Sequence, residues 1–282
     1  SVHFIRWFEY FVNKGHDVHL ISGDPSLVFS QDVEIPGVKV YYLSEKKIAN
    51  RKLSFCYNIL RLPKILGELK NLLQQINPDI LHAHQVHPYG FWGALSNFRP
   101  FVVTPIGSDI IVSAREHWVY GKIARYVFKK VDLVTSDSIV CQEASFEFGA
   151  PRENNYIIQN GVDFTRFNTG VDKDKLRKDF NLGSSPIILS TRAFTPLYNI
   201  DSIIKAIPKI LKFFPDAKFI FCGFFGDLVP EMKKLATDLK LMDSIIFKGY
   251  VNFEDMPFFQ AGADVSVSVP SSDSSPSSVY EA

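Results

Sequence analysis

The chain has 282 residues, of which 46% are hydrophobic and 22% are charged. This composition is ordinary for a globular protein and excludes a disordered, collagen-like or fibrous chain. Its 31 basic and 30 acidic residues give a net charge of +1, which disfavours a nucleic-acid binder because that class usually carries a basic excess. Three well-separated cysteines, Cys56, Cys141 and Cys222, indicate neither a disulfide framework nor a zinc site and favour a cytoplasmic protein.

The N-terminal residues have the apolar spacing of a helix that ends at Gly15, and a buried strand over residues 17–22 follows it. A βα fold places a further strand before such a helix. At the other end, Glu281 and Ala282 have the pattern of the first turn of a helix. We therefore expect a piece of a longer protein, truncated at both ends; the alternative is that both ends are natural.

Strands and helices alternate along the rest of the chain. In the first half, the sequence predicts strands at 38–43, 79–83, 101–104, 133–135 and 156–159, and helices at 52–76, 121–130 and 138–148. We expect Pro63 to mark a break or a fresh start in the first of these helices, because proline lacks the backbone N–H. In the second half, it predicts strands at 187–191, 218–222, 244–247 and 264–269, and helices at 200–214, 230–239 and 253–260.

This alternation predicts an α/β protein with two doubly wound, Rossmann-like parallel sheets. We expect an N-terminal domain over residues 1–170, a polar linker over 171–185 that includes an amphipathic stretch at 174–180, and a C-terminal domain over 186–282. Ligands of such sheets bind at the carboxyl ends of the strands, so the candidate site residues are those that follow strands, facing a cleft between the domains.

Five segments after predicted strands carry side chains suited to binding a phosphorylated sugar. An arginine can donate two parallel hydrogen bonds to phosphate oxygens, carboxylates can accept hydrogen bonds from sugar hydroxyls, and glycines permit close approach of a ligand. The segments are Gly107-Ser108-Asp109; Asn160-Gly161-Val162-Asp163 with Phe167; Arg192 with Tyr198-Asn199; Gly223 with Gly226; and Asp273 with Glu281, in a D-x7-E spacing. Read alone, each also fits a common structural feature such as a turn, an exposed loop or a surface arginine.

Together, their order and spacing resemble the GT-B glycosyltransferases of family 4, a retaining group that uses nucleotide-activated sugars. The resemblance implies an N-terminal acceptor-side domain and a C-terminal domain that binds the nucleotide sugar but is incomplete here. It implies catalytic roles for Asp273 at the donor sugar, Arg192 at the diphosphate and Asp109 at the reacting groups. It implies substrate-binding roles for Glu281 at the ribose, in the opening turn of a helix, Ser277 and Ser278 at the phosphates, and also Gly107, Ser108, His84, Tyr198, Asn199, Gly223 and Asn160, the last with a mainly structural role in the turn toward the hinge.

Three positions depart from the family pattern. Asp273 stands where the family has Glu, Tyr198 stands where it often has Lys, and Ile106 stands where many members have a His before the glycine. His84, with His82 and His87, follows a strand and is the alternative source of a histidine in the cleft. A zinc site built from these three histidines is a further alternative, without a supporting cluster of Cys or Glu.

The resemblance implies an enzyme that transfers a hexose-type sugar from a nucleoside-diphosphate sugar to a glycan or lipid-linked acceptor, in polysaccharide or glycoconjugate biosynthesis. It implies no metal and no cofactor besides the donor, and no nucleic-acid partner. The alternatives are a non-catalytic sugar-nucleotide-binding protein and a nucleotide-sugar epimerase. A basic run, Lys46, Lys47, Arg51, Lys52, Arg61 and Lys64, fits a solvated helix face or peripheral contact with anionic lipid at the inner membrane face.

Overall fold

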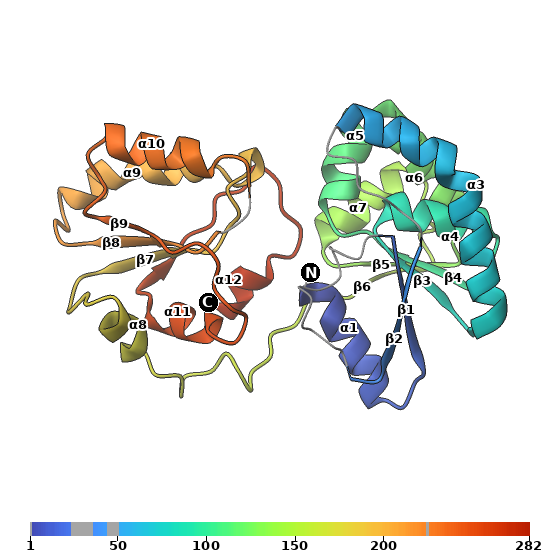
Figure 1. Cartoon of the computed structure of the whole chain (residues 1–282), viewed down its shortest axis with the longest axis horizontal. Helices are drawn as coiled ribbons and strands as arrows, with labels where there is room; N and C mark the ends of the chain where they lie inside the picture. Colours follow the sequence, from blue (N-terminus) through green and yellow to red (C-terminus); the bar gives the residue numbers. More distant parts are fainter. Residues whose placement is uncertain (1, 24–35, 44–50, 224–225) are drawn as a thin grey trace. The chain divides into compact units, whose positions relative to one another are not determined.

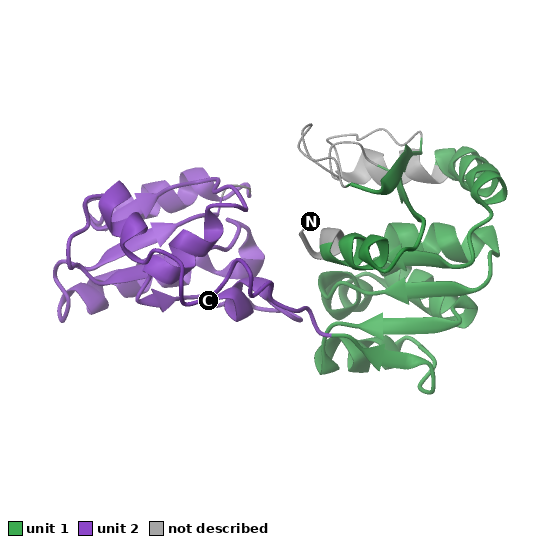
Figure 2. Cartoon of the chain, turned by 90° about the horizontal axis from the view of Figure 1, so that it is seen from below, with its two compact units in different colours: residues 1–158 green, residues 159–282 purple. Residues whose placement is uncertain are grey.

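A computed structural model describes residues 2–23, 36–43, 51–223 and 226–282, with side chains from residue 6 in the first range and from residue 60 in the third. The chain divides into two compact units, residues 1–158 and residues 159–282 (Figure 2). Each unit is an α/β structure in which all described strand pairs are parallel. The α/β class inferred from the sequence is therefore confirmed.

The first unit contains two parallel sheets. β1 (Val18–Ser22) pairs with β2 (Val38–Tyr42), and the second sheet has the order β3 (Leu81–His84), β4 (Phe101–Thr104), β5 (Leu133–Ser136) and β6 (Asn155–Ile157). Its helices are α1 (Val2–Asn13), α3 (Arg51–Ile76), α4 (Phe91–Ser96), α5 (Ala114–Glu116), α6 (Trp118–Lys130) and α7 (Ile139–Glu147), with two π-helical turns, η1 (Val86–Gly90) and η2 (Asp109–Ser113).

The helix α3 shows why the expected break at Pro63 is wrong. It continues through Pro63 to Ile76. Beyond the proline, Ile65, Leu69 and Leu73 recur at a spacing of one helical turn and are 1%, 5% and 6% exposed. Their burial in one core cluster holds the helix together despite the hydrogen bond that a proline removes.

The second unit is a single four-stranded sheet of order β10 (Val265–Ser266), β7 (Ile187–Ser190), β8 (Lys218–Phe221) and β9 (Ile245–Phe247). Its helices are α8 (Asp174–Asp179), α9 (Ile200–Leu211), α10 (Val229–Asp238), α11 (Met256–Gly262) and α12 (Ser277–Glu281), with a 3-10 turn, η3 (Pro196–Tyr198). In Figure 1, α9 and α10 lie on one side of the sheet, and α8 and α11 lie on the other.

Alternating residues of the central strands bury both faces of this sheet. Phe219 and Phe221 of β8 pack in the cluster that contains Ile204 of α9, while Ile220 packs in the cluster that contains Leu176 of α8. The described structure thus covers the sheet with helices on both faces, as the near-continuous apolar strands require.

The boundary between the units differs from the expected one. The division falls after Ile158, so residues 159–170, expected in the N-terminal domain, and the expected linker 171–185 both lie in the second unit. The reason is the amphipathic stretch: Leu176 and Leu182 are 2% and 7% exposed and pack in the same cluster as Ile187 of β7. Among the helices that the structure describes, none is long and apolar enough to cross a bilayer.

Candidate functional site

Three loops of the second unit meet at the carboxyl edge of its sheet. Register pairs the last residue of β7, Ser190, with Phe221 at the end of β8, and pairs Ser266 at the end of β10 with Leu189. Because the strands are parallel and in step, the segments after them converge at one edge, which is where α/β sheets bind ligands. Arg192, Gly223 and Ser268 lie in these segments.

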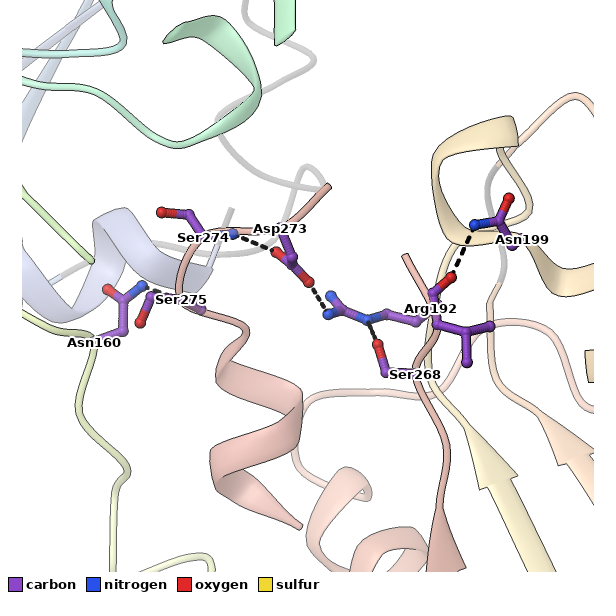
Figure 3. A network of polar contacts seen from close by, with 8 residues as sticks. Asn160, Arg192, Asn199, Ser268, Asp273, Ser274 and Ser275 are labelled. Atoms are coloured by element: carbon purple, nitrogen blue, oxygen red, sulfur yellow. Dashed lines mark hydrogen bonds and ion pairs between the residues drawn. The ribbon is translucent and has the colours of Figure 1, made fainter. Parts of the chain in front are cut away.

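Arg192 is the centre of a polar network at this edge (Figure 3). Its Nε donates a hydrogen bond of 2.7 Å to the Oγ of Ser268, and its Nη2 forms an ion pair with the carboxylate of Asp273. Its guanidinium carbon lies 4.9 Å from the centroid of the Tyr198 ring, which is cation–π distance. The Arg192 side chain is 11% exposed and the Asp273 side chain is 27% exposed, so the pair is accessible mainly from the side of the carboxylate.

Asn199 fastens the loop that carries Asp273 to the start of α9. Its Nδ2 donates hydrogen bonds of 2.9 Å to the carbonyl of Val269 and to the Oγ of Ser271. The backbone N–H of Ser271 donates to the carbonyl of Leu197 at 2.8 Å. Asn199 adopts the left-handed conformation, with φ of 46°, which asparagine tolerates better than most residues. This side chain therefore holds two loops of the site together.

Gln159 and Asn160 contact the loop that carries Asp273, and the helix after it, on the C-terminal side of Asp273. Asn160 Nδ2 donates a hydrogen bond of 3.3 Å to the carbonyl of Ser275, and Gln159 Nε2 donates one of 2.6 Å to the Tyr280 hydroxyl in α12. These contacts agree with the mainly structural role that the sequence suggests for Asn160.

Gly223 and Gly226 lie against the backbone of the loop that carries Arg192. A Cβ atom on Gly223 would lie 1.9 Å from the carbonyl oxygen of Arg192, and one on Gly226 would lie 2.0 Å from that of Phe194. Gly226 also has φ of 136°, a conformation that favours glycine. The two glycines therefore allow two post-strand loops to pack closely. The residues between them, Phe224 and Phe225, lie outside the described residues.

The helix α12 opens at Ser277, earlier than the sequence suggests. Glu281, expected in the opening turn, is instead the last residue of the helix as described. Ser277 and Ser278 occupy the first turn, directly after the loop that bears Asp273. The carbonyl of Ser278 accepts a hydrogen bond of 3.2 Å from Gln260 of α11, which fixes this turn against the unit.

In the first unit, Asp109 joins two loops that follow strands. Its Oδ2 accepts a hydrogen bond of 2.7 Å from the N–H of Val86, after β3, and its Oδ1 accepts one of 3.0 Å from the N–H of Ile106, after β4. The residue is 4% exposed. Burial raises the pKa of Asp109 to about 6, although the two backbone N–H groups oppose the shift. This geometry favours a positioning role over direct contact with a substrate hydroxyl.

The neighbours of Asp109 differ in exposure. Gly107 is buried with φ of 96°, and its carbonyl accepts a hydrogen bond of 2.8 Å from the N–H of Ile111. Ser108 is exposed at the start of η2. Of the three residues predicted here, Ser108 alone presents its side chain to solvent.

The three histidines after or within β3 have different surroundings. His82 Nε2 lies 2.6 Å from the Thr104 hydroxyl, and the rings of His82 and His84 have centroids 4.3 Å apart, both against Trp7. Burial lowers the pKa of His82 to about 4. Burial, together with the neighbouring His82, lowers the pKa of His84 well below its usual value. His87 instead stacks on Tyr120, at 4.2 Å between centroids.

These positions give the zinc alternative no geometric support. The described residues contain no group of three His, Cys, Asp or Glu side chains that could hold a metal ion. The low pKa values indicate that His82 and His84 are neutral at physiological pH.

The structure thus forms two clusters, one in each unit. The second unit brings together Arg192, Tyr198, Asn199 and Asp273, and connects Asn160 to the same loop. The sequence analysis missed Ser268. It lies inside the strand predicted at 264–269, whereas β10 ends at Ser266 and leaves Ser268 in the loop after it.

Two family models match the chain. The model described as "Glycosyl transferase 4-like" matches residues 1–138, and the model described as "Glycosyl transferases group 1" matches residues 172–282. The chain belongs to the GT4-type glycosyltransferases. In this GT4-type chain, the region matched by the group 1 model contains Arg192, Tyr198, Asn199 and Asp273.

Curated relatives of this GT4-type chain include mannosyltransferases. It is 22% identical over 219 residues to the GDP-mannose-dependent alpha-(1-6)-phosphatidylinositol monomannoside mannosyltransferase of Mycolicibacterium smegmatis. This alignment covers 74% of the chain and 57% of the relative. It is 26% identical over 166 residues to the protein of the same name from Mycobacterium tuberculosis, in an alignment that covers 56% of the chain and 43% of the relative. The chain thus spans about half the length of these relatives.

Solved structures share the GT-B fold. HepE from Anabaena, in complex with UDP and glucose, aligns with a TM-score of 0.69 at 19% identity, over 87% of this chain and 64% of that chain. The sucrose-phosphate synthase of Thermosynechococcus elongatus aligns with a TM-score of 0.73 at 17% identity, over 92% of this chain and 66% of that chain. At these identities the similarity establishes the fold, and it confirms the GT-B assignment made from the motifs.

Proposed function

We propose that the protein is a retaining hexosyltransferase that moves a sugar from a nucleoside-diphosphate donor to a glycan or lipid-linked acceptor. The observation that carries the proposal is the Arg192–Asp273 network at the carboxyl edge of the second sheet, inside the region matched by the group 1 model. Support for a nucleotide-sugar donor comes from the relatives, named as GDP-mannose-dependent enzymes, and from HepE, whose structures contain UDP and UDP-glucose.

In this proposal, the second unit binds the donor. The Arg192 guanidinium stabilises the negative charge that develops on the departing diphosphate, because a fixed cation in a partly buried position requires little reorganisation during the reaction. Asp273 orients the hydroxyl groups of the donor sugar. Ser277 and Ser278 bind the phosphates, and Glu281 binds the ribose. The transition state has oxocarbenium character, and the protein contributes charge stabilisation and positioning.

The first unit supplies the acceptor side in this proposal. Asp109 positions the loops after β3 and β4. Ser108 lies in the second of these loops, and His84 is the last residue of β3. The relatives named for phosphatidylinositol monomannoside support a lipid-linked acceptor. Of the basic run considered for lipid contact, Lys46 and Lys47 and the side chains of Arg51 and Lys52 lie outside the described residues. Lys64 pairs with Glu68 at 3.7 Å, which fits a solvated helix face.

A donor panel tests the proposal. The full-length protein is incubated with GDP-mannose, UDP-glucose and other nucleotide sugars, with phosphatidylinositol monomannoside among the acceptors, and release of nucleoside diphosphate is measured. We expect release from one donor, and Arg192→Ala should lower kcat/KM at least about 100-fold, as loss of a transition-state charge partner does.

A matched control removes a cation elsewhere in the same unit. Lys205→Ala breaks an exposed i,i+4 pair with Asp201 on α9 and should leave the rate unchanged. Donor binding without release would instead support the non-catalytic binding protein. Conversion of the donor to an epimer without any acceptor would support the epimerase. Equal rates for Arg192→Ala and the unsubstituted protein would contradict the role given to Arg192.

A further inference from the structure

Arg192 and Asp273 form an ion pair with each other, although the proposed function assigns the diphosphate to Arg192 and the donor sugar to Asp273. The Asp273 carboxylate forms its ion pair with the same guanidinium that a diphosphate would contact. Among the described residues, Arg192 is the only cationic partner of Asp273. A diphosphate that binds Arg192 therefore competes with a carboxylate that is already in place.

We propose that the Arg192–Asp273 pair is an exchange site: a diphosphate replaces the Asp273 carboxylate on the guanidinium, and the released carboxylate accepts hydrogen bonds from the hydroxyl groups of the sugar on that diphosphate. This inference rests on the proposed function, and it adds a coupling between the two halves of the donor. The diphosphate supplies the anion that Arg192 requires, and the sugar supplies the donors that Asp273 then lacks.

The other contacts of Arg192 let the guanidinium stay in place during such an exchange. Its Nε remains bonded to the Ser268 Oγ at 2.7 Å, and the Tyr198 ring remains at 4.9 Å from its central carbon. These contacts engage Nε and the face of the guanidinium, whereas Asp273 engages Nη2 at its end. The Nη1 nitrogen has no hydrogen-bond partner among the described residues. The end of the guanidinium can therefore receive a phosphate through two nitrogens once Asp273 leaves.

The loop that carries Asp273 is fixed on both sides of the residue. Asn199 holds Val269 and Ser271 before it, and Asn160 holds the carbonyl of Ser275 after it. The other oxygen of Asp273 accepts a hydrogen bond of 3.0 Å from the N–H of Ser274, its own neighbour. Release from Arg192 therefore requires the side chain to rotate and does not require the loop to unfold.

The exchange has a consequence for affinity that can be measured. A nucleoside diphosphate without a sugar displaces Asp273 and offers it no new partner. Its binding free energy is therefore reduced by the cost of breaking the charged pair. A nucleotide sugar offers hydroxyl groups in return. The pair should therefore favour the complete donor over the bare diphosphate and assist release of the product.

Calorimetric titration of the full-length protein with GDP, UDP, GDP-mannose and UDP-glucose tests the exchange. Asp273→Asn removes the competing charge with little change of shape. We expect it to bind the preferred bare diphosphate about tenfold more tightly, equivalent to about 1.4 kcal/mol, and to lose preference for the sugar-bearing form. Asp273→Glu retains a carboxylate and should stay near the unsubstituted protein in its affinity for the bare diphosphate.

A control separates exchange from a general effect of charge. Asp201→Asn removes one negative charge from α9 in the same unit, where the carboxylate pairs with Lys205 at 2.7 Å. It should leave both affinities unchanged. Thermal unfolding of each variant establishes that it is folded, and Asp273→Ser provides a second neutral side chain if Asp273→Asn is not.

The outcomes distinguish this inference from the proposed function. Nucleotide binding that Arg192→Ala abolishes, with bare-diphosphate affinity unchanged or weakened in Asp273→Asn, would overturn the exchange and leave the donor site in place. Equal tightening in Asp201→Asn would also overturn it. If the unsubstituted protein binds no nucleotide at all, the proposed function and the exchange fail together.

Discussion

At the scale of single residues, Asp109 is a buried acid whose proton is coupled to folding. Its carboxyl group is 4% exposed, and burial raises its pKa from 3.8 to about 6. Since the folded protein holds this proton more tightly than the unfolded chain does, the neutral form favours folding. That contribution is complete below about pH 4 and is lost as the pH rises through about 6.

Asp109→Asn should therefore change how stability depends on pH. Between pH 4 and 6, the free energy of unfolding of the unsubstituted protein should fall relative to that of the variant, by up to about 3 kcal/mol for a shift of about two units. Urea unfolding at several pH values measures this difference. The depressed pKa of His82 acts in the opposite direction but is common to both proteins, so it cancels. Parallel curves would show that Asp109 has an ordinary pKa.

The residues that sequence could identify are those whose chemistry is unusual for their position. A charged residue in a segment that follows a strand, such as Arg192 or Asp273, stands out, and the structure brings the two together. Ser268 did not stand out because the sequence places it within the strand predicted at 264–269, whereas β10 ends at Ser266. The partners of Asp109 are backbone N–H groups, which leave no trace in the sequence.

At the scale of elements, α8 shows how packing overrides a polar composition. Its surroundings are full of charge, which suggests a linker, but Leu176 is 2% exposed. A Cβ atom on Gly262 of α11 would lie 2.6 Å from the Cβ of Leu176, so the two helices approach closely at this point. The helix is therefore part of the second unit.

Leu176→Ala should destabilise the second unit by about 2–5 kcal/mol, the usual cost of removing a buried leucine side chain. Denaturant unfolding measures the change. Lys178→Ala on the same helix, where Lys178 lies at 4.0 Å from Asp172 in an exposed pair, should change the stability by less than about 0.5 kcal/mol. Equal, small effects of the two substitutions would favour the linker that the sequence suggests.

Strands and long helices with a clear apolar pattern were predictable, and the shortest helical elements were not. The strand at 101–104 was predicted with its observed bounds, and the helix after Ser138 begins where the Ser138 hydroxyl accepts a hydrogen bond of 3.1 Å from the N–H of Cys141. The turns η1 and η2 and the helices α4 and α5 were missed, because helical elements of three to six residues show too few apolar repeats at helical spacing to form a pattern.

At the scale of the whole molecule, the hydrophobic core is divided between the units. Ile110 is fully buried in a cluster made of residues from the first unit, and Ile204 is fully buried in a cluster made of residues from the second. Regular alternation of strands and helices predicted one parallel sheet for each of two domains, whereas the described strands of the first unit form two sheets. The point of division was less predictable, because it depends on where Leu176 and Leu182 pack.

Separate cores predict separate unfolding transitions. In scanning calorimetry of the full-length protein, Ile110→Ala should lower the midpoint of one transition and Ile204→Ala that of another, each corresponding to about 2–5 kcal/mol. The two substitutions together should lower both midpoints additively, because the sites share no core cluster. A single transition that either substitution lowers would mean that the units unfold as one.

The close packing of Gly223 against the Arg192 carbonyl predicts which positions of this site a mutational scan would find intolerant to substitution. Almost any other residue at position 223 displaces the backbone that carries the arginine, so selection would retain the glycine whether or not it meets a substrate. A ranking of positions by intolerance to substitution would place Gly223 beside Arg192. One position is constrained by the space its neighbour leaves, and the other by the charge it carries.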